Sequence, residues 1–234
     1  MQQNAEGFAV ALDNQSPEFA QIALQGPKAN EILLPLCDGP LPEKNYSFSE
    51  LTENGIPAIV TRTGYTGEDG VELYCAAKDG EGLFKLLLEA GKPYGILPCG
   101  LGARDTLRFE AGMPLYGHEL GKDITPREAG LGFAIKLDKG DFIGREGLQE
   151  APARVRIGLK LIDRGIARGG EDVLINSKKI GITTSGVPSP TLNASYAMAL
   201  VDAQAANETA FAIVVRNRPL QAEQVSLPFY KRSK

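Results

Sequence analysis

An alternation of apolar and polar residues that begins at Arg154 constrains the fold more than any other feature of the chain. Val155, Ile157, Leu159 and Leu161 alternate with Arg154, Arg156, Gly158 and Lys160. Because successive side chains of a strand point to opposite faces, this period of two predicts a half-buried β-strand. Further short, β-rich segments follow at 173–175, 179–183, 196–201 and 210–215. Short strands separated by turn residues are typical of an antiparallel barrel or sandwich.

The earlier part of the chain has a different, mixed pattern. A strand is predicted over 19–24, and apolar residues then recur at the spacing of one helical face: Ala29, Ile32, Leu33 and Leu36. Pro27 suits the start of this helix, and Pro35 should end or kink it early. Two more helices are predicted, over 81–90 and from about residue 100.

This change of pattern predicts two domains with a boundary near Pro152. We expect an α+β domain over 1–150 and an all-β domain over 153–234. A chain of 234 residues with 43% hydrophobic and 23% charged residues can bury a core of that size.

Composition and charge argue against several classes of protein. The net charge of -4 lacks the basic character that phosphate contacts need, so we expect no nucleic acid partner. No apolar run approaches the roughly 20 residues of a bilayer crossing, and no secretory signal opens the chain, so we expect no membrane association and a cytoplasmic location. The three widely spaced cysteines, Cys37, Cys75 and Cys99, are expected to be reduced core thiols rather than metal ligands.

A glycine-punctuated segment, GYTGEDGVELY at 64–74, separates two strand-like runs. Glycines supply positive φ without steric strain, so the segment predicts a hairpin, with Glu68 and Asp69 in its solvent-facing turn. In the strand that leaves the turn, Val71, Leu73 and Cys75 share one face and Glu72 lies on the other. A solvated carboxylate is the simplest interpretation of Glu72.

The other polar candidates also have simple interpretations. Arg104 and Arg108 lie four residues apart on one side of a predicted helix, as in a salt-bridged surface. Ser185 and Ser189 are predicted to lie in turns, where hydroxyls satisfy backbone groups. The single histidine, His118, lacks a nucleophile motif or a cysteine partner, so we expect a structural role and no metal site.

Several blocks of the sequence nevertheless resemble glycine cleavage T proteins, in the same order along the chain. They are LQGPKA at 24–29, RTGYTGEDGVE at 62–72, GARDTLRFEAG at 102–112, LYG at 115–117, FIGRE at 142–146, TSG at 184–186 and SPTL at 189–192. The resemblance implies an α+β folate-binding, aminomethyltransferase-type domain with ferredoxin-like elements, followed by a C-terminal antiparallel β-barrel.

The resemblance also implies an activity in one-carbon metabolism and glycine catabolism. Members of the family transfer an aminomethyl group from the lipoyl arm of the H protein to tetrahydrofolate, which gives methylenetetrahydrofolate and ammonia. The implied partner is thus the lipoylated H protein, the acceptor substrate is tetrahydrofolate, and no metal takes part.

By position, Glu72 matches the family's glutamate that grips the pteridine, and a carboxylate can accept two parallel hydrogen bonds from such a ring. Arg104 matches the pocket arginine and Tyr65 a folate-contacting tyrosine. We therefore expect Glu72 and Arg104 to line the same cavity. Tyr230 or Arg232 corresponds to a C-terminal contact.

The match to the family differs at the N-terminus. Asn4 resembles an asparagine that touches the pteridine, and the family's catalytic aspartate stands on the strand before it, whereas only Met1, Gln2 and Gln3 precede Asn4 here. We expect the catalytic carboxylate to lie upstream of Met1, so no residue of this sequence is assigned a catalytic role. Three explanations stay open: a separate chain supplies that portion, the start is misplaced, or the chain is a truncated folate-binding remnant.

Three functional hypotheses follow. The first is an aminomethyltransferase that needs the upstream portion, and the second is a non-catalytic folate-binding or H-protein-binding module. The third is a folate domain of the related dimethylglycine or sarcosine oxidising enzymes. The motif YTGED at 65–69 favours the T protein over the folate domains of these oxidising enzymes.

Overall fold

The computed structural model describes residues 2–232, which form two compact units. The first unit contains the residues up to Gly64 together with Glu68–Cys99, and the second contains Tyr65–Gly67 together with the residues from Gly100 onward. In this division of the chain, residues 100–153 belong to the same compact unit as the barrel. The predicted domain division at 150 and 153 stays a prediction.

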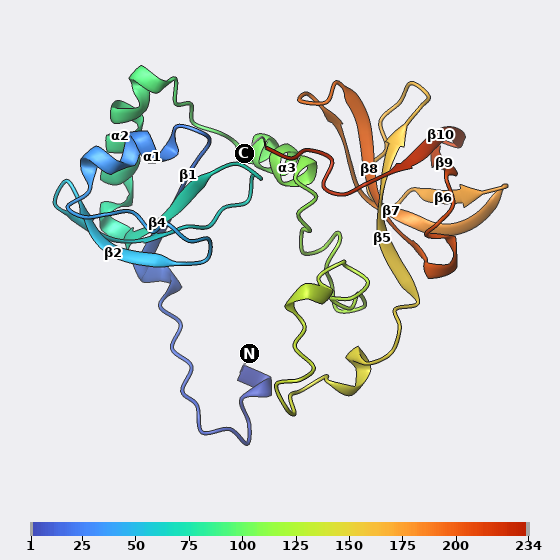
Figure 1. Ribbon diagram of the computed structural model, residues 1–234, viewed down its shortest axis with the longest axis horizontal. Helices are drawn as coiled ribbons and strands as arrows, with labels where there is room; N and C mark the ends of the chain where they lie inside the picture. Colours follow the sequence, from blue (N-terminus) through green and yellow to red (C-terminus); the bar gives the residue numbers. More distant parts are fainter. Residues whose placement is uncertain (1, 233–234) are drawn as a thin grey trace. The chain divides into compact units, whose positions relative to one another are not determined.

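The first unit is built on a four-stranded antiparallel sheet, which lies with α1 and α2 in Figure 1. The strand order is β1-β4-β3-β2. Its strands are β1 (Phe19–Gln25), β2 (Phe48–Glu53), β3 (Ile56–Thr61) and β4 (Gly70–Ala76). Two α-helices, α1 (Ala29–Leu33) and α2 (Gly80–Gly91), pack on the sheet through one apolar cluster. The buried members of this cluster are Leu24, Ala29, Ile32, Leu33, Ala58, Val60, Val71, Leu73, Cys75, Leu83 and Leu87.

Local chemistry explains these elements. As predicted, α1 is short, because the chain passes into the 3-10 helix Leu34–Leu36 at the position of Pro35. The predicted hairpin is also confirmed, since β3 pairs antiparallel with β4 and Thr61 lies opposite Glu72. Alternation along β4 buries Val71, Leu73 and Cys75 and leaves Glu72 and Tyr74 half-buried on the other face.

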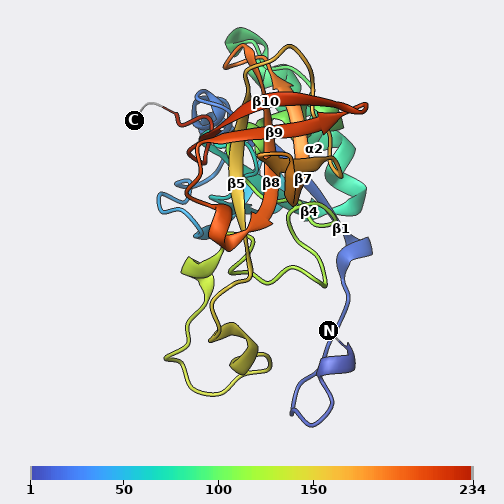
Figure 2. The same cartoon turned by 90° about the vertical axis from the view of Figure 1, so that its right-hand side faces the viewer.

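The second unit begins with α3 (Leu101–Glu110) and ends in a closed six-stranded antiparallel barrel. The strand order around the barrel is β10-β5-β8-β7-β6-β9. Its strands are β5 (Arg154–Leu161), β6 (Asp172–Ile175), β7 (Lys178–Ser189), β8 (Ala194–Asp202), β9 (Ala210–Val215) and β10 (Arg218–Val225). Figure 2 looks onto this barrel, where β9 and β10 run across the direction of β5 and β8. The antiparallel barrel expected from the sequence is confirmed.

Short 3-10 helices complete the described chain. They are Gln2–Asn4, Ser16–Glu18, Leu34–Leu36, Ala77–Asp79, Lys92–Tyr94, Gly132–Ala134, Glu146–Leu148 and Ala203–Ala205. No helix among residues 2–232 combines the length and the apolar character that a bilayer crossing requires.

The structure corrects two predictions about local placement and adds two strands. Ser185 and Ser189 lie within β7 rather than in turns, because β7 continues past a bulge between Thr183 and Ser185. Cys99 is exposed, so it is not a core thiol, although all three cysteines are free. The strands β2 and β10 were not predicted: β2 buries only Glu53, and β10 opens with an Arg-Pro pair before Leu220 and Ala222 alternate with Gln221 and Glu223.

Candidate functional site

Glu72 is the carboxylate that the glycine-rich hairpin presents. Its Oε1 accepts a hydrogen bond from Gln21 Nε2 at 2.9 Å, and its Oε2 accepts one from the hydroxyl of Thr63. Thr63 Oγ1 in turn lies 2.6 Å from Thr61 Oγ1. Glu72 is therefore not a freely solvated side chain, since a different neutral donor holds each of its carboxylate oxygens.

An ion pair closes the base of the same loop. Arg62 Nη2 lies 2.7 Å from both carboxylate oxygens of Asp69, and Asp69 Oδ1 also accepts the Gly70 amide at 2.9 Å. Asp69 and Glu68 are both half-buried. The prediction of a solvent-facing turn is thus wrong for Asp69, because its carboxylate is half-buried and binds Arg62 and the Gly70 amide.

Tyr65 and Arg104 come together in the second unit. The guanidinium of Arg104 lies over the Tyr65 ring, 4.8 Å from the ring centroid, and Tyr65 Oη donates to the carbonyl of Pro114 at 2.5 Å. Burial raises the pKa of the Tyr65 phenol, which keeps it a neutral donor. Gly67 has φ of +77°, and a Cβ there would lie 2.8 Å from Ala111 Cβ, so a glycine is needed where the loop meets the end of α3.

Arg104 itself is exposed on α3, but Arg108, one turn later, is buried. Arg108 Nη1 donates to Glu119 Oε2 at 2.9 Å and its Nη2 donates to Ser185 Oγ at 3.0 Å. The interpretation of Arg104 and Arg108 as a salt-bridged surface is therefore wrong for Arg108. This residue instead joins α3 to β7 within the second unit.

The end of α3 has a second polar connection to the barrel. Glu110 is buried and accepts hydrogen bonds from Ser189 Oγ at 2.5 Å and from Thr191 Oγ1 at 2.7 Å. Its backbone carbonyl accepts the amide of Tyr230 at 2.8 Å. Tyr230, a candidate C-terminal contact, is thus placed beside the last turn of α3.

The remaining candidates lie near the two ends of the described chain. Asn4 is exposed in its 3-10 helix near the N-terminus, and Arg232 is exposed near the C-terminus. Glu72 belongs to the first unit, whereas Arg104 belongs to the second. That Glu72 and Arg104 line one cavity stays a prediction.

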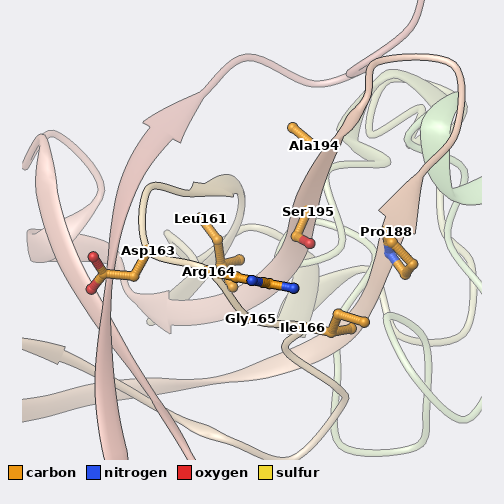
Figure 3. A pocket seen from close by; sticks show the side chains of 8 residues that line it. All are labelled: Leu161, Asp163, Arg164, Gly165, Ile166, Pro188, Ala194 and Ser195. Atoms are coloured by element: carbon orange, nitrogen blue, oxygen red, sulfur yellow. The ribbon is translucent and has the colours of Figure 1, made fainter.

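A surface cavity of about 410 Å³ lies on the barrel and is shown in Figure 3. It is lined by Leu161, Asp163, Arg164, Gly165, Ile166, Pro188, Ala194 and Ser195. No candidate folate contact is among these residues. The candidate residues therefore form two separate groups, Glu72 with its partners in the first unit and Tyr65 with Arg104 in the second, and this cavity belongs to neither.

Sequence reasoning missed the residues that hold Glu72 in place. Thr61 lies directly opposite Glu72 across the hairpin, so correct strand pairing would have revealed it. Gln21 comes from β1, which is 51 residues away in sequence, and no local pattern signals that contact. Within residues 2–232, no group of three or more His, Cys, Asp or Glu side chains is arranged to hold a metal ion.

Comparison with known proteins adds independent findings. The profile described as "GCVT N-terminal domain" matches residues 1–139, and that of the "Glycine cleavage T-protein C-terminal barrel domain" matches residues 154–231. An aminomethyltransferase of Geobacillus sp. (strain WCH70) is 49% identical over 233 residues, which cover 96% of this chain and 64% of that protein. One of Bacillus mycoides (strain KBAB4) is 52% identical over 229 residues, covering 94% of this chain and 63% of that protein.

A solved structure shows the same similarity. The crystal structure of glycine cleavage system aminomethyltransferase T from Bartonella henselae superposes with a TM-score of 0.84 at 32% identity. The match covers 98% of this chain and 64% of that one. The chain therefore spans slightly less than two thirds of the length of these relatives.

Proposed function

The chain belongs to the glycine cleavage T-protein family, and from this premise we propose that it binds tetrahydrofolate as the acceptor of an aminomethyl group. The donor is the lipoyl arm of the H protein, and the products are methylenetetrahydrofolate and ammonia. The proposal includes a cytoplasmic location and the division into a folate-binding domain over 1–150 and a barrel domain over 153–234.

The observation that carries the proposal is the ordered carboxylate of Glu72. Gln21 and Thr63 hold one oxygen each, and each carboxylate oxygen has about two acceptor positions. One position on each oxygen is left to accept a second donor. Such a pair suits two parallel N–H donors on one edge of a planar heterocycle, which the pteridine ring of tetrahydrofolate offers.

The other proposed folate contacts supply complementary chemistry. Arg104 provides a cation over the ring of Tyr65, with which an aromatic or anionic part of the substrate can interact. Asn4 offers an amide that both donates and accepts. Tyr230 or Arg232 completes the proposed set.

Isothermal titration calorimetry of tetrahydrofolate tests the proposal. We expect Glu72→Gln to weaken binding by about 1.5 to 3 kcal/mol, or about ten- to a hundredfold, because a charge-assisted pair of hydrogen bonds is lost. Glu68→Gln, on the same loop, serves as the matched control and should bind like the wild type. Equal affinities of the two variants would refute the role of Glu72.

Catalysis forms a separate part of the proposal. We propose that the family's catalytic aspartate lies outside these 234 residues and that turnover requires a segment that carries it, supplied by another chain or fused before Met1. One positioned side chain commonly contributes about a hundred- to ten-thousandfold in rate. We therefore expect folate binding without substantial turnover by these 234 residues alone.

The test is methylenetetrahydrofolate formation from aminomethylated H protein, with and without the N-terminal segment of a relative. The same segment with its aspartate changed to asparagine is the control. Full activity of the 234-residue chain alone would contradict the requirement for the segment. Folate binding without activity in every combination would instead favour a non-catalytic folate-binding or H-protein-binding module.

A further inference from the structure

We propose that Thr63 is a positioning residue for Glu72, with Gln21 as its counterpart on the other carboxylate oxygen, and that the two together set the affinity for tetrahydrofolate. This inference rests on the proposed function, because it concerns how the folate-binding carboxylate is oriented. Neither residue stands among the proposed folate contacts.

The hydroxyl groups define the direction of the hydrogen bonds. A carboxylate accepts only, so the single proton of the Thr63 hydroxyl is donated to Glu72 Oε2. The contact of 2.6 Å between Thr63 Oγ1 and Thr61 Oγ1 therefore has Thr61 as its donor, and the same Thr61 proton is shared with the backbone carbonyl of Glu72, which lies 3.2 Å from Thr61 Oγ1. Both threonine hydroxyls are thus directed at Glu72, Thr63 at its carboxylate and Thr61 at its backbone carbonyl and at Thr63, and linked hydrogen bonds polarise one another.

Gln21 fixes the second oxygen by the same reasoning. Its Nε2 lies 2.9 Å from Glu72 Oε1 and 3.1 Å from the hydroxyl of Tyr74. An amide nitrogen carries two protons, and both have an acceptor on β4. The amide is thus held by two neighbouring side chains of one strand, and it restricts rotation of the carboxylate.

Orientation of the carboxylate has a direct consequence for binding. With one acceptor position occupied on each oxygen, the remaining positions point in directions that Thr63 and Gln21 determine. A glutamate without these donors must lose rotamer freedom when a ligand arrives, which weakens binding even though its charge is unchanged. Thr63 therefore acts on affinity through Glu72 and not through its own contact with the ligand.

The experiment is a double-mutant cycle read by calorimetric titration of tetrahydrofolate into the 234-residue chain. We expect Thr63→Val to weaken binding about tenfold, the loss that corresponds to one hydrogen bond to a charged group. Thr63→Ser keeps the hydroxyl and should restore most of the affinity. In the Glu72→Gln background, Thr63→Val should have little further effect, because residues that act as a unit are not additive.

Thr52→Val is the matched control, since it removes a threonine hydroxyl from β2 of the same sheet, where the side chain of Thr52 interacts with Asp38. This variant should bind like the wild type. If Thr63→Val fails to fold, as judged by thermal unfolding, Gln21→Leu at an exposed position takes its place in the cycle. Gln21→Leu is expected to weaken tetrahydrofolate binding in the wild-type background and to have little further effect in the Glu72→Gln background.

The outcomes separate the inference from the proposed function. Additive losses in Thr63→Val and Glu72→Gln, or no loss in Thr63→Val, overturn the positioning role while the role of Glu72 stands. Wild-type affinity in Glu72→Gln overturns the proposed function and this inference with it. If Thr63→Ser does not restore tetrahydrofolate binding, the hydroxyl of Thr63 is not the group that positions Glu72.

Discussion

Arg108 and Glu119 form a buried ion pair in which Arg108 Nη1 lies 2.9 Å from Glu119 Oε2 and the side chains are 2% and 0% exposed. The remaining polar atoms also have partners, since Thr184 Oγ1 donates to Glu119 Oε1 at 2.6 Å and Arg108 Nε donates to Asp105 Oδ1 at 2.8 Å. A buried pair of this kind is tolerated because its hydrogen bonds are complete. The placement of α3, and with it of Arg104, depends on this pair.

Glu119→Ala should therefore destabilise the protein strongly. The substitution removes the buried partner of Arg108 and leaves only the half-exposed Asp105 as a counter-ion, and breaking a buried pair costs about 3 to 5 kcal/mol. Urea denaturation measures the change in the free energy of unfolding. Glu81→Ala is the control, because its ion pair with Lys85 is 81% and 73% exposed and should contribute at most about 1 kcal/mol. Similar losses in both variants would contradict the structural role of the buried pair.

Alanine substitutions at two glycines should change stability in opposite directions. A Cβ at Gly186, in β7, would lie 2.4 Å from the carbonyl oxygen of Ala167, a backbone atom that cannot easily move. Gly186→Ala should cost about 1 to 3 kcal/mol or more through overpacking. Gly82, in α2, has no atom within 4 Å of such a Cβ, so Gly82→Ala should stabilise the helix by about 0.5 to 1 kcal/mol. Shifts of the urea midpoint in the same direction would contradict this prediction.

Glu53 should make stability depend on pH. Its side chain is fully buried, and Oε2 has no hydrogen-bond partner among the described residues. Burial is the main cause that raises the pKa of Glu53 from 4.5 to about 7, and Asp38 reinforces the shift. Cys37 also faces the carboxyl group, with Sγ 4.0 Å from Oε1, and the neighbouring Cys75 thiol has a pKa that is raised mainly by burial.

Between pH 4.5 and about 7 the folded protein binds more protons at Glu53 than the unfolded chain does, so stability falls as pH rises through this window. Glu53→Gln removes the penalty. At pH 8 the variant should be more stable than the wild type by at most about 3 kcal/mol, and near pH 4 the difference should vanish. Urea denaturation at both pH values measures it, with the exposed Glu50→Gln on the same strand as control. A pH-independent difference would rule out titration of Glu53 as the cause.

Arg104→Ala should weaken tetrahydrofolate binding by about tenfold, if the cation over Tyr65 contacts the substrate as proposed. Lys139 supplies a matched control, because its Nζ lies 4.6 Å from the centroid of the Phe142 ring in the same unit but outside the proposed site. Lys139→Ala should bind tetrahydrofolate like the wild type. Equal losses in calorimetric titrations of the two variants would mean that Arg104 has no specific role.

The sequence by itself determined the features that depend on neighbours along the chain. The period of two at β5, the early end of α1 at Pro35 and the hairpin before β4 all follow from local backbone preferences. The same alternation placed Glu72 on the face opposite Leu73, and family resemblance selected Glu72 as a candidate. These features were predictable because local geometry dictates which side of an element a residue occupies.

The tertiary structure alone decided what each polar side chain meets on its side of the element. Arg108 was interpreted as part of a salt-bridged surface, yet it is buried and donates a hydrogen bond to Ser185 Oγ of β7, 77 residues away. Glu110 is also buried, and it accepts a hydrogen bond from Ser189 Oγ of β7, 79 residues away. Gln21 reaches Glu72 only because β1 pairs with β4. Strand register and barrel closure bring these distant hydrogen-bond partners together. The spacing of nearby residues encodes neither of them. The burial and pairing of these polar side chains are therefore decided only when the whole unit is folded.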